Sequence, residues 1–125
     1  MELFKHAVGW VEIPVTDFSR AKKFYSAIFD YEMPEMPMGS GTMGILPHDH
    51  ETGVGGAIVA AEGYVPSTQG TLVYLNGGSD LNAVLNRVAE AGGRQELEKT
   101  QIPGMGYYAF FIDTEGNKVG LYSVG

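Results

Sequence analysis

The stretch "VEIPVTDFSRAKKFYSAIFDYE", residues 11–32, changes its hydrophobic period halfway along. In its first part Val11, Ile13 and Val15 alternate with other residues, which is the period of a β-strand. In its second part apolar side chains recur every three or four residues, which is the period of one helix face. These apolar side chains are Phe18, Ala21, Phe24, Tyr25, Ile28 and Phe29. The stretch therefore predicts a strand that leads directly into a helix.

Residues at both ends of this helix support its limits. Thr16 or Asp17 precedes the first apolar helical residue, and the side-chain oxygen of either can cap the N-terminus. Asp30 follows the last apolar residue and is predicted to end the helix, because Asp tolerates the left-handed conformation better than most residues. The pattern thus predicts a strand within residues 7–15 and a helix over residues 16–29.

The rest of the chain repeats this order of elements. Three short strands are predicted after the first helix, at residues 31–38, 41–48 and 54–61. A strand at 71–76 then leads into a second helix at 80–91, with Ser79 or Asp80 as its cap. Three more strands are predicted at residues 95–102, 106–113 and 118–123.

The repetition indicates an internal duplication. Aligning Asp17 with Asp80 gives an offset of 63 residues, about half of the 125-residue chain. We call residues 1–62 module one and residues 63–125 module two, and we expect both to form one domain, because neither has an obvious core of its own. This chain length is usual for a single domain.

Composition excludes several classes of function. The net charge is −7 with only 8 Lys+Arg, so nucleic acid is a poor partner, because phosphate binding needs clustered cations. No basic amphipathic helix indicates a membrane surface, and no signal pattern or long apolar run is present. The absence of cysteine excludes disulfides, thiolate metal sites and a cysteine nucleophile, and it fits a cytoplasmic protein.

Two blocks of sequence resemble the vicinal oxygen chelate superfamily, which includes glyoxalase I, bleomycin-resistance proteins and extradiol dioxygenases. The first is the opening stretch, where Asp17, Ala21, Phe24 and Tyr25 match the pattern D-x-x-x-A-x-x-F-Y. The second is "YYAFFIDTEGNKVGLYS", residues 107–123, whose D-T-E-G-N turn resembles the family's D-P-[DE]-G-N. The resemblance implies an α+β fold of two βαβββ modules that form curved, cup-shaped mixed sheets with flanking helices.

The resemblance also says where a metal would be bound. Metal-dependent members take His, Gln or Glu ligands from the first and last strands of each module. Carried onto this chain, those positions fall on Trp10, near 55–57, within 71–73, and on Gly120. Because Trp and Gly offer no lone pair to a divalent cation, we expect a glyoxalase-like branch that lacks the usual metal ligands and has no cofactor.

The segment "PHDHETG", residues 47–53, holds the densest group of ligand-type residues. His48, His50 and Glu51 leave open an adventitious site for zinc or nickel. The favoured interpretation is a solvated polar turn between the third and fourth strands, because Asp, Thr and Gly are turn-forming residues.

Strand parity predicts which side chains line a cavity. If Val11, Ile13 and Val15 pack under the helix, then Val8, Trp10 and Glu12 face the opposite side. The same parity on the last strand selects Lys118, Gly120 and Tyr122. The candidate ligand-binding residues are Trp10, Glu12, Tyr74, Tyr108, Phe110, Gly120 and Tyr122.

Glu12 has two interpretations. As a candidate catalytic residue it is a general base, and as a binding residue it is the counter-charge for a cation. The alternative is that Trp10 belongs to the core and that Glu12 pairs with Lys118 or is exposed.

Three functions remain open at this point. The favoured one is a bleomycin-resistance-like protein that binds a small molecule, cationic or aromatic, in an aromatic-lined cavity without metal. The second is a lyase or isomerase resembling lactoylglutathione lyase, dependent on metal or using Glu12 or a tyrosine. The third is a non-catalytic dimerisation module. The resemblance also implies a homodimer, and it leaves open whether modules pair within or between chains.

Overall fold

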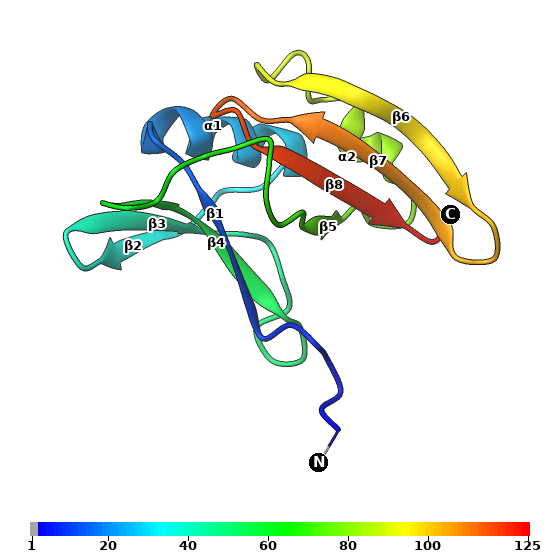
Figure 1. Ribbon diagram of the computed structural model, residues 1–125, viewed down its shortest axis with the longest axis horizontal. Coiled ribbons are helices and arrows are strands. Elements are labelled where there is room, and N and C mark those ends of the chain that lie inside the picture. Colours follow the sequence, from blue (N-terminus) through cyan, green and yellow to red (C-terminus); the bar gives the residue numbers. More distant parts are fainter. Residues whose placement is uncertain (1–2) are drawn as a thin grey trace.

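Two four-stranded sheets with equivalent strand order make up the computed structural model, which describes residues 3–125 (Figure 1). Sheet A has the order β1-β4-β3-β2 and contains β1 (Trp10–Pro14), β2 (Glu35–Met38), β3 (Gly41–Ile45) and β4 (Gly55–Ala60). Sheet B has the order β5-β8-β7-β6 and contains β5 (Tyr74–Asn76), β6 (Arg94–Ile102), β7 (Gly106–Ile112) and β8 (Lys118–Ser123).

Both sheets are mixed, because β1 pairs parallel with β4 and β5 pairs parallel with β8, whereas the remaining pairs are antiparallel. Helix α1 (Phe18–Phe29) follows β1, and helix α2 (Asn82–Leu85) follows β5. The predicted α+β fold of two βαβββ modules is confirmed. The strands are shorter than predicted at several ends, because a strand ends where its partner ends. Thus β1 begins at Trp10, opposite the first residue of β4.

Helix α1 ends at Phe29 as predicted and begins at Phe18, two residues after the predicted start. The backbone N–H of Arg20 donates to Asp17 Oδ1 at 3.1 Å, so Asp17 rather than Thr16 caps the helix. Asp30 ends the helix with φ of 50°, in the left-handed region. Within residues 3–125, no helix has the length and apolar character needed to cross a membrane.

The second helix is shorter than the predicted span of residues 80–91. The α-helix covers only Asn82–Leu85, and tighter turns follow it to Gly92 and Gly93. Beyond Leu85 the hydrogen bonds no longer form a regular α-helical series, because the Val88 N–H donates to Leu85 O, three residues back, whereas the Ala91 N–H donates to Arg87 O, four residues back, both at 3.1 Å. Apolar side chains that recur every three or four residues in this span are nevertheless buried, at Leu81, Val84, Leu85 and Val88. We call residues 86–93 the helical turns.

The main hydrophobic core contains residues of both modules. Phe24 and Tyr25 of α1 lie against Phe111 of β7, with ring centroids 5.8 and 6.4 Å apart. Figure 1 shows α1 beside both sheets, so the helix of module one covers part of module two. The two modules are therefore joined within one chain by shared packing.

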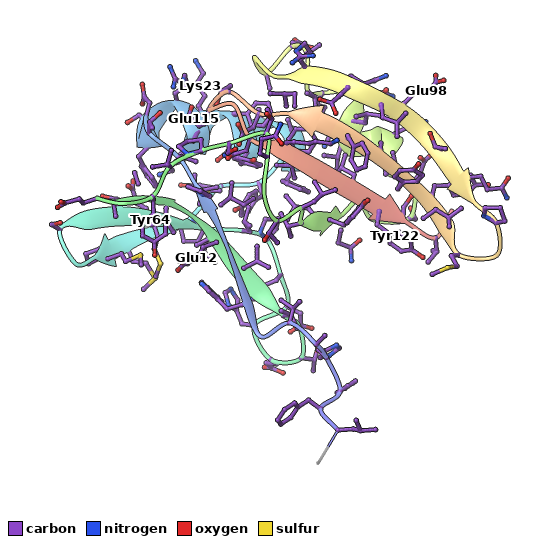
Figure 2. All side chains as sticks on the ribbon, viewed as in Figure 1. Glu12, Lys23, Tyr64, Glu98, Glu115 and Tyr122 are labelled. Carbon is purple, nitrogen blue, oxygen red and sulfur yellow. The ribbon has the colours of Figure 1, made fainter. Side chains whose placement is uncertain are left out.

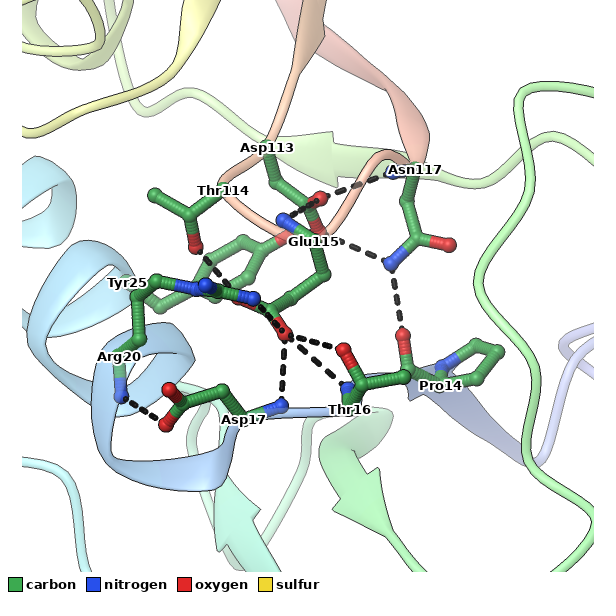
Figure 3. Close-up of polar contacts among 9 residues, drawn as sticks. All are labelled: Pro14, Thr16, Asp17, Arg20, Tyr25, Asp113, Thr114, Glu115 and Asn117. Atoms are coloured by element: carbon green, nitrogen blue, oxygen red, sulfur yellow. Dashed lines mark hydrogen bonds and ion pairs between the residues drawn. The ribbon is translucent and has the colours of Figure 1, made fainter.

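A polar cluster joins the modules at the turn between β7 and β8, residues 113–117, which we call the inter-module turn (Figure 3). Asp113 accepts hydrogen bonds from the Tyr25 hydroxyl at 2.7 Å and from the Asn117 backbone N–H at 2.9 Å. The Asn117 side-chain amide donates to Pro14 O at 2.7 Å, at the end of β1. The turn thus holds both β1 and α1.

Glu115 supplies the charged part of the same contact. Its side chain has 0% exposure and pairs with the Arg20 guanidinium, with Nε 2.7 Å from Oε2. The backbone N–H groups of Thr16 and Asp17 also donate to Glu115, at 3.1 and 2.8 Å. One enclosed carboxylate of module two therefore bonds the corner between β1 and α1 of module one.

Acid is predicted to weaken this contact. Burial raises the pKa of Glu115, but hydrogen bonds from Arg20, Asp17, Thr114 and Thr16 outweigh it and lower the pKa from 4.5 to about 2. Since the folded-state pKa is depressed, the carboxylate stabilises the fold above about pH 4.5, and this stabilisation is lost as the pH falls toward 2. Its full size is up to about 3 kcal/mol.

The test compares the wild type with Glu115→Gln by urea unfolding between pH 7 and pH 3. We expect the free energy of unfolding to fall more steeply with acid in the wild type, because the variant lacks this titrating group. Parallel declines in the two proteins would contradict the assignment.

Loss of the Tyr25 hydroxyl is predicted to destabilise the chain. Tyr25→Phe removes a buried donor to Asp113, and the cost is about 1–3 kcal/mol. Tyr107→Phe is the matched control, because within residues 3–125 the Tyr107 hydroxyl has no hydrogen-bond partner, and we expect a change below about 0.5 kcal/mol. Chemical denaturation of both variants measures this difference, and equal losses would count against the assigned role of Tyr25.

Candidate functional site

Trp10 and Glu12 form a polar and aromatic site with Tyr64 on the outer face of sheet A. Trp10 is 45% exposed, and its indole Nε1 donates to Glu12 Oε2 at 3.3 Å. The Tyr64 hydroxyl donates to Glu12 Oε1 at 2.8 Å. Figure 2 shows Glu12 and Tyr64 close together on this sheet. Each carboxylate oxygen thus has a fixed donor, and we call these three residues the Trp10 site.

The alternation of β1 places this site. Ile13 and Val15 are buried on the α1 side, so Trp10 and Glu12 point to the opposite face. Trp10 is therefore not a core residue.

Tyr64 reaches the site from the segment after β4, where its backbone N–H donates to Ala61 O at 3.1 Å. The hydrogen bond to Glu12, with smaller contributions from desolvation and charge, raises the pKa of Tyr64 and keeps the hydroxyl protonated. Tyr64 could not be predicted from the sequence, because it lies in a connecting segment rich in Gly, Pro and Ser that has no hydrophobic periodicity.

His48 lies against this site, which corrects the expectation that residues 47–53 form only a solvated turn. Its ring meets Trp10 edge to face, with centroids 6.5 Å apart, and its Nδ1 lies 2.8 Å from Leu46 O. A Cβ at Gly55 would come within 2.5 Å of His48 Nε2, so the ring needs a glycine beneath it. Asp49 makes the predicted turn by accepting from the N–H of Glu51 at 2.9 Å.

Strand register identifies the equivalent positions of the two modules. Trp10 pairs with Gly55 in sheet A, and Tyr74 pairs with Gly120 in sheet B. Tyr74, rather than a residue within 71–73, is therefore the counterpart of Trp10.

None of these four positions carries an imidazole or carboxylate, so the residues do not fit the metal of the metal-dependent relatives. In the described part of the chain, no three His, Asp or Glu side chains are grouped as metal ligands.

Sheet B presents a second aromatic surface. The ring centroid of Phe110 lies 5.9 Å from that of Tyr74 and 5.4 Å from that of Tyr108. A Cβ at Gly120 would lie 2.5 Å from the Tyr74 ring, so this glycine lets the ring lie over β8. Lys118 Nζ lies 4.4 Å from the Phe110 centroid. We call Tyr74, Tyr108 and Phe110 the Tyr74 surface.

Within one chain the predicted ligand-binding residues fall into two groups rather than one cavity. Trp10 and Glu12 lie on sheet A, whereas the others lie on sheet B: Tyr74, Tyr108, Phe110, Gly120 and Tyr122. Figure 2 shows Tyr122 well away from Glu12, and the Tyr122 hydroxyl donates to Met105 O.

The ion pairs of the two sheets are also separate. Lys118 pairs with Glu96 at 3.2 Å, so the alternative pairing of Glu12 with Lys118 is wrong, whereas Glu12 is exposed, as the same alternative allowed.

An apolar cavity of about 440 Å³ lies where the two modules meet. His48 and Gly55 line it from module one, and Tyr74 lines it from module two. Its other walls include Val8, Val11, Phe29 and Leu46. Of the predicted ligand-binding residues only Tyr74 lines this cavity, and Trp10 and Glu12 do not, because they point to the face of sheet A opposite Val11.

Comparison with known proteins supports the family. The model of the Glyoxalase/Bleomycin resistance protein/Dioxygenase superfamily matches residues 7–121. A "Glyoxylase-like domain-containing protein" of Didymella fabae is 34% identical over 116 residues, which cover 88% of each chain. CFP32 of Mycobacterium tuberculosis, named as a candidate glyoxylase, is 27% identical over 91% of this chain, and the match covers only 44% of that relative's length.

A solved structure has a similar fold. TnmS3, an antibiotic binding protein from Streptomyces sp. CB03234, superposes with a TM-score of 0.64 and 20% identity, and the match covers 99% of this chain and 100% of that one. From the family match and the Didymella fabae relative, the chain belongs to the glyoxalase/bleomycin resistance protein/dioxygenase superfamily.

Proposed function

We propose that this protein binds a small aromatic cation at the Trp10 site, without a metal ion. The observation that carries the proposal is the exposed indole of Trp10 bonded to the carboxylate of Glu12. An indole face attracts cations and stacks on aromatic rings. The carboxylate beside it provides the counter-charge, and its two donors fix its position.

The surroundings of the site suit an apolar ligand of variable shape. Met36 and Met43 face each other across β2 and β3, and Met36 is 46% exposed. Thioether side chains are flexible and polarizable, so they adapt to irregular ligands. The net charge of −7 favours the approach of cations over anions. TnmS3, with a similar fold, is named as an antibiotic binding protein, which is consistent with a binding role.

A metal-dependent lyase or isomerase is the weaker alternative. Such an enzyme needs ligands at positions that here hold Trp10, Gly55, Tyr74 and Gly120. Within the Trp10 site, the hydrogen bond between Tyr64 and Glu12 is a contact suited to proton transfer. None of the four residues at the ligand positions supplies an imidazole or a carboxylate, so binding stays the proposed function.

We also propose that two chains form a homodimer. Large apolar side chains are exposed on both groups of site residues, with Trp10 at 45% and Tyr74 at 46%. Apolar surface of this kind usually marks a site of association. A dimer that brings sheet A of one chain to sheet B of its partner would enclose the Trp10 site with the Tyr74 surface.

The dimer is tested by sedimentation equilibrium over a wide concentration range. We expect a mass of twice the 13.5 kDa of one chain, and a shift toward monomer in Tyr74→Glu, because a charge there disrupts an apolar contact. Tyr107→Glu would be a poor control, because that side chain packs on the core. Glu62→Lys, on the exposed segment after β4, is the control for a change of charge. A wild-type monomer at all concentrations would contradict the proposal.

Ligand binding can be measured through Trp10, which is the only tryptophan in the chain. We expect N-methylacridinium to quench the fluorescence of Trp10 with saturation, and Glu12→Gln to weaken binding about two- to fivefold, since Glu12 is exposed and a charge contact at an exposed site is worth roughly 0.5–1 kcal/mol. Glu62→Gln removes the same charge from an exposed position and should bind as the wild type does. Equal affinity in wild type and Glu12→Gln would refute the role of Glu12.

A further inference from the structure

A second groove lies on the helix side of the molecule, between α1 and the helical turns. It encloses about 720 Å³. The buried side chains of Ile13 and Val15 point toward this side of sheet A, whereas Trp10 and Glu12 point away from it. The groove is therefore separate from the Trp10 site.

Small residues create the hollow. Ala27 of α1 faces Ala91 and Gly92 of the helical turns across the groove. Gly92 has φ of +107°, which disfavours any residue with a side chain, and a Cβ there would lie 3.2 Å from Thr114 Cγ2. The floor is therefore open and weakly polar, and it can accept the organic part of a small ligand.

Cations surround this floor. Arg20, Lys23 and Arg87 line the groove, and they are three of the 8 Lys+Arg in the chain. Arg20 and Lys23 are three residues apart on α1, so they share one face of the helix. In Figure 2, Lys23 lies on the outer side of α1 near Glu115. Such clustering stands out in a chain with a net charge of −7.

In both arginines, hydrogen bonds from one side of the guanidinium group hold the side chain in place. Arg20 donates from Nε and Nη2 to Glu115, and Arg87 donates from Nη1 to Ile28 O at 3.0 Å. The hydrogen bond to Glu115 also raises the pKa of Arg20. A guanidinium has five N–H donors, so several remain for a ligand in a preorganised position. Lys23 has no ion pair within residues 3–125.

Acidic residues limit the size of the ligand. Glu90 lies on the rim, and Glu115 neutralises the charge of Arg20. The charges that remain are those of Lys23, Arg87 and Glu90, so the net charge of the groove is one positive charge. Such a groove suits one compact anion better than an extended polyanion, whose repeated phosphates would meet Glu90.

We propose that this groove binds a small phosphate ester, with the phosphate on Lys23 and the two guanidinium groups and the organic part over Ala27, Ala91 and Gly92. Guanidinium forks match phosphate oxygens in geometry and charge. This site is independent of the Trp10 site, so either can fail without the other.

Phenyl phosphate is the probe, with inorganic phosphate as the comparison, and isothermal titration calorimetry at low ionic strength is the measurement. We expect saturable binding of one phenyl phosphate per chain. Binding should be about fivefold weaker or more in Lys23→Gln and in Arg87→Gln, because a charged hydrogen bond contributes roughly 1 kcal/mol or more. Inorganic phosphate should bind more weakly than the ester, because it leaves the floor uncovered.

Lys22→Gln is the matched control, since Lys22 is the neighbour of Lys23 on α1 but pairs with Glu35 at 2.8 Å. It should bind as the wild type does, and so should Trp10→Phe. Absence of saturable binding would overturn the proposal. So would equal weakening in all three charge variants, which would show a general effect of net charge, or equal affinity for the ester and inorganic phosphate. Lys23 makes no ion pair in the described chain, so Lys23→Gln tests the groove even if Arg87→Gln impairs folding.

Discussion

The enclosed carboxylate of Glu115 is the contact on which the arrangement of this molecule depends. It belongs to module two, yet its donors include the backbone N–H and hydroxyl of Thr16, the backbone N–H of Asp17 and the guanidinium of Arg20, all in module one. Asp113 and Asn117 extend the contact to Tyr25 and Pro14. Because β1 ends at Pro14 and carries Trp10 and Glu12, the inter-module turn also fixes the strand that bears the candidate site.

In both modules an aromatic ring lies over a glycine, but the ring comes from a different part of each module. Each has a glycine opposite the first residue of its first strand, Gly55 in sheet A and Gly120 in sheet B. His48 lies over Gly55, and Tyr74 lies over Gly120. Aromatic rings thus occupy the space over these strand pairs, where the metal-dependent relatives carry ligand side chains. Stacking and apolar contact are the interactions that these rings offer at the two positions.

Local sequence patterns predicted the parts of the structure that depend on local interactions. The strand period predicted that Trp10 and Glu12 point away from the helix that packs on Ile13 and Val15. The residue types of Asp17 and Asp30 predicted the N-terminal cap and the left-handed end of α1. The short length of α2 was not predicted, because tighter turns bury Leu81 and Val88 as well as a longer α-helix would. The hydrogen bond of Tyr64 with Glu12 and the contact of His48 with Trp10 were not predicted, because the partners come from different elements. The hydrogen bond from Asp17 N–H to Glu115 spans 98 residues, and no periodicity reveals it.

The indole Nε1–H signal of Trp10 in a ¹⁵N–¹H NMR spectrum tests the central claim most directly, because the chain has one tryptophan and its indole bonds to Glu12. In protein stripped of metal by a chelator, titration with N-methylacridinium should move this single signal to saturation, and added Zn²⁺ or Ni²⁺ should not change the titration curve. A signal that responds only after metal is added would contradict a metal-free site at Trp10 and Glu12.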